Sequence, residues 1–223
     1  MKKLYFVSIC LVFAAILTLI LGCFSLCWGD SFSEEDYAKF QKEDLERQEI
    51  IDSKPIVSLD GNVISDNISA LPQSSPLKAA AKGSYPHNKG VYLYTKDTVH
   101  KIAGVVGHAS IIYNTTQIIE ATSDGVSYGK NNWDKKSHCR AGFIPVLSQT
   151  AMNKTANKAR SWLGLPYNWH FTNTATRKMF YCSQLVWAAY KDVTGFNLNS
   201  GNDIVFPSEL MSSKHTSIIY SKG

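Results

Sequence analysis

A cysteine at the start of an apolar helix is the residue of this chain best suited to chemistry. Leu185, Val186 and Ala189 follow Cys182 at helical spacings, so they share one helix face with it. The preceding segment, 172–178, is polar and has no regular period, which places Cys182 in the first helical turn. Unpaired N–H groups and the positive end of the helix dipole favour a thiolate there. Cys182 is therefore a candidate nucleophile.

Two other roles compete for this cysteine. Free cysteines are among the most buried residue types, so Cys182 could simply belong to the core. It could also form a disulfide with Cys139, the only other cysteine that follows the N-terminal apolar segment. Two cysteines are a thin framework for a domain of this size, and we expect Cys182 to be free. A thiolate nucleophile also needs a partner base elsewhere in the chain.

His108 is the best candidate for that base among the six histidines. It lies inside an apolar strand, 105–113, and Gly107 beside it leaves backbone space for a substrate or a helix to approach. An imidazole changes charge near neutral pH, as a catalytic base must. The alternative is an ordinary core or edge histidine.

Glu120 is the candidate third residue, because it places a carboxylate within an otherwise apolar strand. A three-residue hairpin loop at 114–116 would pair Ser110 with Glu120 and put the carboxylate on the face of His108, within reach of long side chains. A two-residue loop would turn Glu120 to the opposite face. An exposed strand position is the alternative for Glu120, and Asp124 is the reserve partner for the histidine.

Together these residues form a Cys–His–Glu set, which is recognised by roles and not by chain order. The order here, histidine, carboxylate, cysteine, is the reverse of the usual papain arrangement. Tyr167 and Trp169, in the loop ahead of the cysteine, are candidates to line a substrate cleft, with aromatic core as the alternative. The chemistry requires no metal and no cofactor. His138-Cys139 alone is not a zinc signature, and the chain has no CxxC.

Strands followed by helices must position these side chains. We expect an α+β domain in which helices pack on one side of an antiparallel sheet. Ser148 should cap one helix, and Gly195 should end the helix of Cys182. The expected strands are 90–95, 105–113, 117–121, 126–128 and 143–147, with an edge strand at 217–220. The expected helices are 148–163 and the segment from Cys182, with a short turn or helix at 207–210.

The chain divides into three expected parts. Residues 1–29 begin with Lys2 and Lys3 followed by an apolar run, which predicts an export signal or a membrane anchor. A cleaved signal, a lipid on Cys23 and an uncleaved span compete, and we favour a membrane-tethered form. Each of the three places the rest of the chain outside the cytoplasm, in the cell envelope. Residues 30–84 read as a charged helix or stalk and linker, and 85–223 as the catalytic domain.

The net charge of +5 includes Lys2 and Lys3, so the remainder is only mildly basic. No arginine-rich arm or basic patch interleaved with aromatic residues is present in the sequence, which argues against a nucleic-acid partner. We expect a monomer.

Four segments carry a resemblance to a known family: 107–111, 119–121, 164–169 and 181–187. They look like the circularly permuted papain-like amidases of the YiiX/YaeF type, relatives of the NlpC-type cell-wall peptidases. The resemblance covers roughly residue 85 to the C-terminus. It implies Cys182 as nucleophile, His108 as base, Glu120 as orienter, and a small papain-like fold. One departure is visible, because the Pro-Gly-Asp element common at the start of such domains is not recognisable around 86–91.

Three functions follow as expectations. The first is a thiol-dependent hydrolase that cleaves an amide or ester bond in the cell envelope through a thioester. The second is a lipid-directed cysteine acyltransferase or esterase, and the third is a non-catalytic envelope binding domain. The expected partner is a peptide, cell-wall or lipid-derived substrate.

Overall fold

The computed structural model of the protein describes residues 30–65, 81–97, 101–102, 104–201 and 203–223. Every element below belongs to the compact unit Phe32–Gly223. The expected export segment, 1–29, lies outside the described residues. Within the described ranges, no helix is both long enough and apolar enough to cross a membrane.

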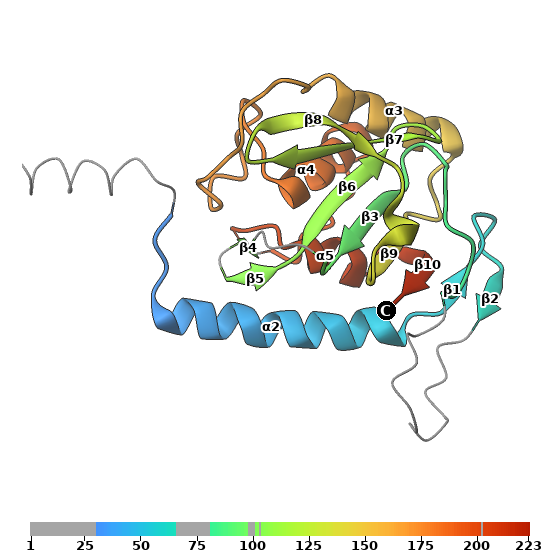
Figure 1. Ribbon diagram of the computed structural model, residues 1–223, viewed down its shortest axis with the longest axis horizontal. Coiled ribbons are helices and arrows are strands. Elements are labelled where there is room, and N and C mark those ends of the chain that lie inside the picture. Colours follow the sequence, from blue (N-terminus) through green and yellow to red (C-terminus); the bar gives the residue numbers. More distant parts are fainter. Residues whose placement is uncertain (1–29, 66–80, 98–100, 103, 202) are drawn as a thin grey trace, which may run out of the picture. The chain divides into compact units, whose positions relative to one another are not determined.

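The main sheet has eight strands in the order β2-β1-β10-β9-β3-β6-β7-β8 (Figure 1). Adjacent strands of this sheet are antiparallel, except for β1 and β10, which run parallel. The strands are β1 (Ile56–Val57), β2 (Val63–Ser65), β3 (Tyr92–Thr95), β6 (His108–Ile112), β7 (Gln117–Thr122), β8 (Gly125–Lys130), β9 (Cys139–Phe143) and β10 (Ser217–Lys222). A separate hairpin joins β4 (Lys101–Ile102) to β5 (Val105–Val106).

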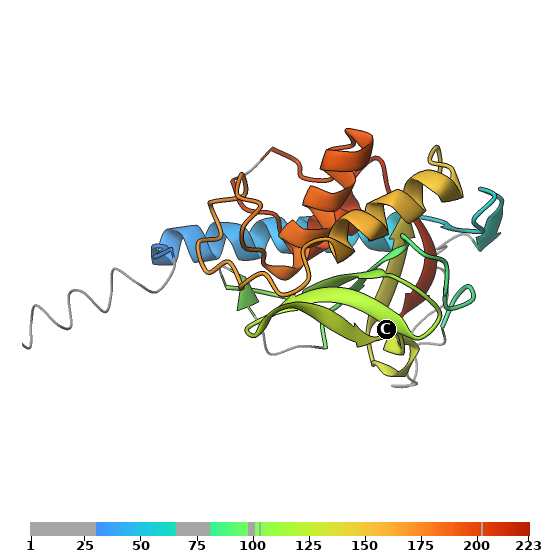
Figure 2. The same cartoon turned by 90° about the horizontal axis from the view of Figure 1, so that it is seen from above.

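Two helices, α3 (Gln149–Arg160) and α4 (Cys182–Thr194), pack against each other and against β6 and β7. Figure 2 shows both on the same side of the green strands. A 3-10 helix, η1 (Trp133–Lys135), precedes β9. The expected α+β class is confirmed.

The strands alternate between two apolar clusters, as a pleated sheet buried on both faces requires. Tyr94 and Ile111 belong to the cluster that includes the apolar residues of α4. Leu93 and Ile112, their chain neighbours, belong to the other cluster, with Trp133. The sheet therefore separates the helix layer from a second, smaller core.

The first described helix, α2 (Glu34–Ser53), differs from the expected solvated helix or stalk. It buries Arg47, Gln48 and Ile51, and it contacts α5 (Pro207–Ser212) and β5. The amide of Gln48 donates to the hydroxyl of the buried Tyr94 at 2.9 Å. The composition of this segment predicted a solvated helix because two of the three residues that the helix buries are polar. The expected linker also differs, since β1 and β2 form within it, while 66–80 lie outside the described residues.

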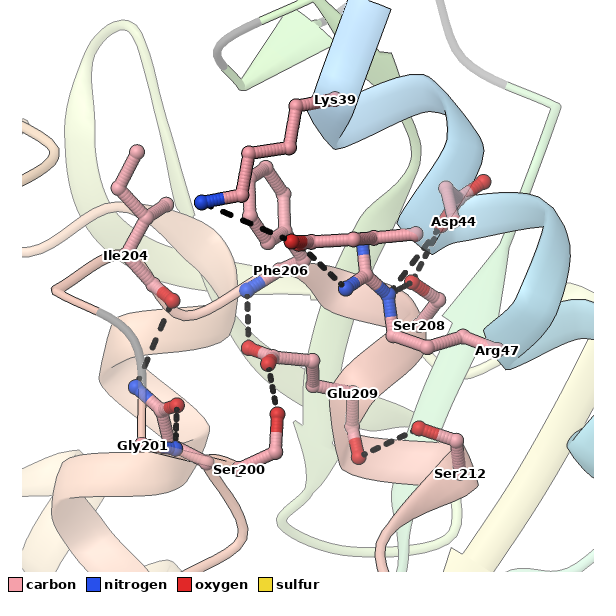
Figure 3. Close-up of polar contacts among 12 residues, drawn as sticks. Lys39, Asp44, Arg47, Ser200, Gly201, Ile204, Phe206, Ser208, Glu209 and Ser212 are labelled. Atoms are coloured by element: carbon pink, nitrogen blue, oxygen red, sulfur yellow. Dashed lines mark hydrogen bonds and ion pairs between the residues drawn. The ribbon is translucent and has the colours of Figure 1, made fainter. Parts of the chain in front are cut away.

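Arg47 is the centre of the contact between α2 and α5 (Figure 3). Its guanidinium lies 4.8 Å above the centroid of the Phe206 ring, and its Nε donates to the hydroxyl of Ser208 at 3.0 Å. The buried carboxylate of Glu209 accepts from the Phe206 N–H at 2.9 Å and from the Ser200 hydroxyl at 2.5 Å. The Arg47 contacts tie Phe206 and Ser208 to α2, and the Glu209 contacts tie Ser200 to the same turn.

Two strand predictions were wrong in detail. The strand expected at 143–147 is β9, which ends at Phe143, because Leu147 N–H closes a turn on the carbonyl of Ile144. Pro145 has no N–H to give to a strand ladder. The strand expected at the sheet edge, β10, instead lies inside the sheet between β1 and β9.

Candidate active site

Cys182 is the first residue of α4, as its sequence position predicts, and only 2% of it is exposed. Tyr181 is the N-cap with an extended backbone, and its N–H donates to the side-chain oxygen of Gln184 at 3.2 Å. The helix ends at Gly195, whose φ of 77° lies in the left-handed region. The thiol therefore lies at the positive end of the helix dipole.

Side chains on both sides of Cys182 hold the start of α4 in place. The Tyr181 hydroxyl accepts from the Val205 N–H at 2.8 Å and donates to the Phe171 carbonyl at 3.2 Å. The Ser183 hydroxyl donates to the Val205 carbonyl at 2.6 Å. Because all of these groups are buried or partly buried, the first turn has little freedom to move.

The hairpin between β6 and β7 has the three-residue loop that places Glu120 on the histidine's side. The N–H groups of Tyr113 and Asn114 both donate to the Gln117 carbonyl, and the Asn114 side chain accepts from two N–H groups within the loop. Ser110 pairs with Glu120, as the register argument predicts.

That register brings Glu120 to His108. The carboxylate Oε2 lies 2.6 Å from Nε2 of the imidazole, and 8% of His108 is exposed. His108 also hydrogen-bonds the Cys182 thiol. The three predicted side chains therefore meet, in the order sulfur, imidazole, carboxylate.

The ionisation of the thiol and the imidazole is coupled. Burial acts to lower the pKa of His108, but hydrogen bonds and charges of Cys182 and Glu120 outweigh it and raise that pKa to about 9. Burial acts to raise the pKa of Cys182, but the hydrogen bond and charge of His108 and the Ala109 N–H lower it below the ordinary value. The arrangement favours a thiolate beside an imidazolium.

The space beside Gly107 is filled by the protein itself. A Cβ at this position would lie 3.0 Å from Tyr94 Cε2 and 3.2 Å from Pro207 Cβ. Of the two expected neighbours, a substrate or a helix, the structure has the helix, α5. Gly107 thus lets α5 approach the strand that carries His108.

Tyr167 and Trp169 lie in the loop ahead of α4. Their ring centroids are 4.7 Å apart, and 52% of Trp169 is exposed. Burial and the charge of Cys182 raise the pKa of Tyr167 well above its usual value. The phenol therefore stays protonated, and it lies close enough to Cys182 to interact electrostatically with the charge of the thiolate.

Sequence reasoning missed the polar network that shapes this loop. Asn168 is fully buried, and its amide donates to the Asn173 carbonyl at 3.1 Å and to the Gln184 side-chain oxygen at 3.0 Å. Its own oxygen accepts from the His170 N–H at 3.0 Å. A buried asparagine in a polar loop carries no sequence signal that separates it from an exposed one.

It also missed Trp133, which covers the imidazole. The two ring centroids are 5.5 Å apart with planes inclined by 35°, and 4% of Trp133 is exposed. The indole lies in η1, outside the hairpin that carries His108 and Glu120. Because the two residues are far apart in the sequence, no local sequence pattern predicts their contact.

The other candidates are not in the site. Cys139 and Cys182 are both free, so the disulfide alternative is wrong. Burial raises the pKa of Cys139 to about 12, which keeps it a thiol. Asp124 is exposed in the turn between β7 and β8, and Glu120 holds the histidine instead. Among the described residues, no three His, Cys, Asp or Glu side chains are placed to hold a metal ion.

Comparison with known families decides the relationship. The family described as permuted papain-like amidase enzyme, YaeF/YiiX, C92 family, matches residues 87–220, more than half of the chain. The chain belongs to this family. It is therefore a cysteine amidase or peptidase with a permuted papain-like fold, as the four sequence segments indicated.

Two further comparisons complete the description. The crystal structure of the metalloprotein YiiX from Escherichia coli O157:H7 is similar, with 16% identity and a TM-score of 0.48. That similarity covers 60% of this chain and 97% of that one. Comparison with curated proteins gave no match. The family match begins at residue 87, so α2, β1 and β2 lie outside it.

Proposed function

We propose that the protein hydrolyses an amide bond with Cys182 as nucleophile, His108 as acid and base, and Glu120 as the residue that orients the imidazole. The observation that carries this proposal is the continuous contact from Glu120 through His108 to Cys182. A carboxylate on one ring nitrogen fixes which nitrogen faces the thiol. The buried position makes each charge interaction stronger than it would be in water.

The reaction proceeds in two halves. The Cys182 thiolate attacks the substrate carbonyl carbon, and the carbonyl π electrons move to oxygen. The N–H groups at the start of α4, that of Cys182 first, point toward the oxyanion. The C–N bond then breaks, the imidazolium of His108 gives its proton to the leaving amine, and a thioester remains. His108 takes a proton from water, whose oxygen attacks the thioester and releases the acid and the thiolate.

Tyr167 and Trp169 are proposed to contact the substrate. The protonated Tyr167 hydroxyl is a hydrogen-bond donor near the thiol, and the exposed Trp169 offers an aromatic face beside it. Aromatic side chains with a polar handle suit a cleft that is apolar at its base and wet at its mouth.

We place the reaction in the cell envelope, on a peptide or other cell-wall substrate. The support is the N-terminal segment of the sequence, where Lys2 and Lys3 precede an apolar run. The same segment supports the second candidate, a lipid-directed esterase or acyltransferase, because a membrane tether would bring a lipid substrate to the site. No metal or cofactor enters either reaction as proposed.

The test is to trap the acyl group and to compare substrates. Full-length protein is incubated with muropeptides or with acyl esters, and intact mass is measured after rapid acid quenching, with Cys182→Ala as the control. An acyl adduct on Cys182 from muropeptides, together with amine release, supports the amidase. Turnover of esters alone would favour the lipid-directed candidate, and no adduct and no turnover with either would leave a binding domain.

A further inference from the structure

The carboxylate of Glu120 lies over the backbone of Gly129 on the neighbouring strand. A Cβ built on Gly129 would lie only 2.0 Å from Oε1 of Glu120 and 2.8 Å from its Cδ. Real Cβ atoms do not approach other atoms this closely, so the site of the missing methyl group is occupied by the carboxylate. The other oxygen of the same carboxylate, Oε2, binds His108.

The register of β7 and β8 accounts for this arrangement. Ser127 is opposite Glu120, and Gly129 is opposite Ile118, two residues earlier on the same face of β7. A long side chain at position 120 can therefore reach the diagonal position at 129. The φ angle of Gly129 lies outside the left-handed region, so its backbone would accept any residue.

Steric crowding at position 129 comes first from the carboxylate. The nearest atoms to a Cβ there are the flexible end of Glu120 and, at 3.0 Å, Cγ1 of Ile118. An alanine could be accommodated if the flexible Glu120 side chain turned away and Cγ1 of Ile118 shifted by a few tenths of an ångström. It would, however, move Oε2 from the short contact with the imidazole.

We propose that Gly129 is a positioning residue, whose missing side chain sets the orientation of the Glu120 carboxylate and through it of His108. This inference rests on the proposed roles of Glu120 and His108. The three atoms nearest to a Cβ at Gly129 belong to Glu120 and Ile118, and none belongs to Cys182 or His108. Its effect on the reaction must pass through the carboxylate.

The experiment is a double-mutant cycle in the full-length protein, read out by the pH dependence of Cys182 alkylation with iodoacetamide and of hydrolysis. The four proteins are wild type, Gly129→Ala, Glu120→Ala and the double variant. Lys130→Ala is the matched control, because Lys130 is the next residue of β8, exposed, with its side chain on the opposite face. Thermal unfolding is recorded for all five.

We expect Gly129→Ala to lower hydrolysis by about ten- to a hundredfold, the effect of a displaced catalytic group. Its alkylation profile should shift in the same direction as that of Glu120→Ala. In the Glu120→Ala background, adding Gly129→Ala should change neither profile further. If Gly129→Ala alone folds poorly, removal of the carboxylate should restore folding, since the clash is with Glu120.

Three results would overturn the inference. These are wild-type profiles for Gly129→Ala, additive losses in the double variant, and a folding defect that Glu120→Ala does not relieve. Failure of the proposed function is distinguishable, because Glu120→Ala and Cys182→Ala would then leave hydrolysis intact. If the enzyme is functional and Gly129→Ala leaves hydrolysis and alkylation unchanged, only the positioning role of Gly129 is refuted.

Discussion

Burial alone would leave Cys182 and His108 uncharged, because a low dielectric penalises each ion by itself. The attraction between the thiolate and the imidazolium offsets this penalty, and Glu120 is a second negative partner for the imidazole. The pair is charged between the lowered pKa of the thiol and the raised pKa of the imidazole, near 9. At the residue scale, the proposed nucleophile depends on both contacts of His108.

Glu120→Gln tests the second of these contacts. Glutamine keeps the size of the side chain but removes its charge, so the pKa of His108 should fall from about 9. The alkaline limb of the pH profile of kcat/KM should move to lower pH, because the imidazolium is lost earlier. We expect kcat/KM at neutral pH to fall about a hundredfold, within the range for a misplaced acid or base. An unchanged alkaline limb would contradict the assigned role of Glu120.

At the scale of elements, α4 is held by segments on either side of its first turn. The loop 165–180 reaches it through Asn168 and Gln184, and the segment 200–209 reaches it through Val205. That second segment is in turn tied to α2 by Arg47. Helix α2, outside the family match, thus contributes to the support of the proposed nucleophile.

Asn168→Ala should loosen the loop before α4. It leaves the Asn173 carbonyl, the His170 N–H and the Gln184 side chain without a shared partner, at a cost of about 1–3 kcal/mol in the free energy of unfolding. KM should rise more than kcat falls, because Tyr167 and Trp169 lie in this loop. Urea unfolding and steady-state kinetics measure both, with Lys178→Ala, an exposed change in the same loop, as control. Equal behaviour of the two variants would refute the role of the network.

Arg47→Ala tests the attachment of α2. The change removes the stacking on Phe206 and the hydrogen bond to Ser208, and we expect the free energy of unfolding to fall by about 1–3 kcal/mol. Lys39→Ala on the same helix removes a side chain that is 67% exposed and should change stability by less than about 0.5 kcal/mol. Urea denaturation compares the two. A stalk that merely extends from the domain would tolerate both changes equally.

The sequence predicted those elements whose signals are local. For the hairpin at 114–116 the sequence left two loop lengths open, and the three-residue loop of the structure gives the β6–β7 register that brings Glu120 to His108. The packing of α2 was not predictable, because Arg47 and Gln48 read as solvent-facing residues until their partners in α5 and β3 are known. Gly129 and Trp133 act through contacts across strands, which no spacing along one segment encodes.

At the scale of the whole molecule, a buried histidine outside the site makes the free energy of unfolding depend on pH. His138 is 9% exposed, and its Nδ1 accepts the Lys96 N–H at 3.1 Å, which fixes the neutral form. Burial, with the charges of Arg140 and Lys96, lowers its pKa to about 3. The unfolded chain binds a proton near pH 6.5, so the unfolded state gains protons first as pH falls.

Stability should therefore decline as pH drops from about 6.5 toward 3. For a single group of this kind, the loss by pH 5 amounts to as much as about 2 kcal/mol. His138→Gln keeps an acceptor for the Lys96 N–H but cannot be protonated, so its free energy of unfolding should change less between pH 7 and pH 5. Urea denaturation at both pH values measures the difference. Parallel curves for the two proteins would show that His138 is already charged in the folded state.

The most direct test of the central claim is the rate of Cys182 alkylation as a function of pH in wild type and in His108→Ala. If the thiolate is held by the imidazolium, wild-type protein should react fast at neutral pH and reach its plateau at a lower pH than an ordinary thiol, whose pKa is 9. His108→Ala should react slowly at neutral pH and rise only at a higher pH than wild type, because the largest effects that oppose burial, the hydrogen bond and charge of His108, are then absent. Superimposable profiles would contradict the account.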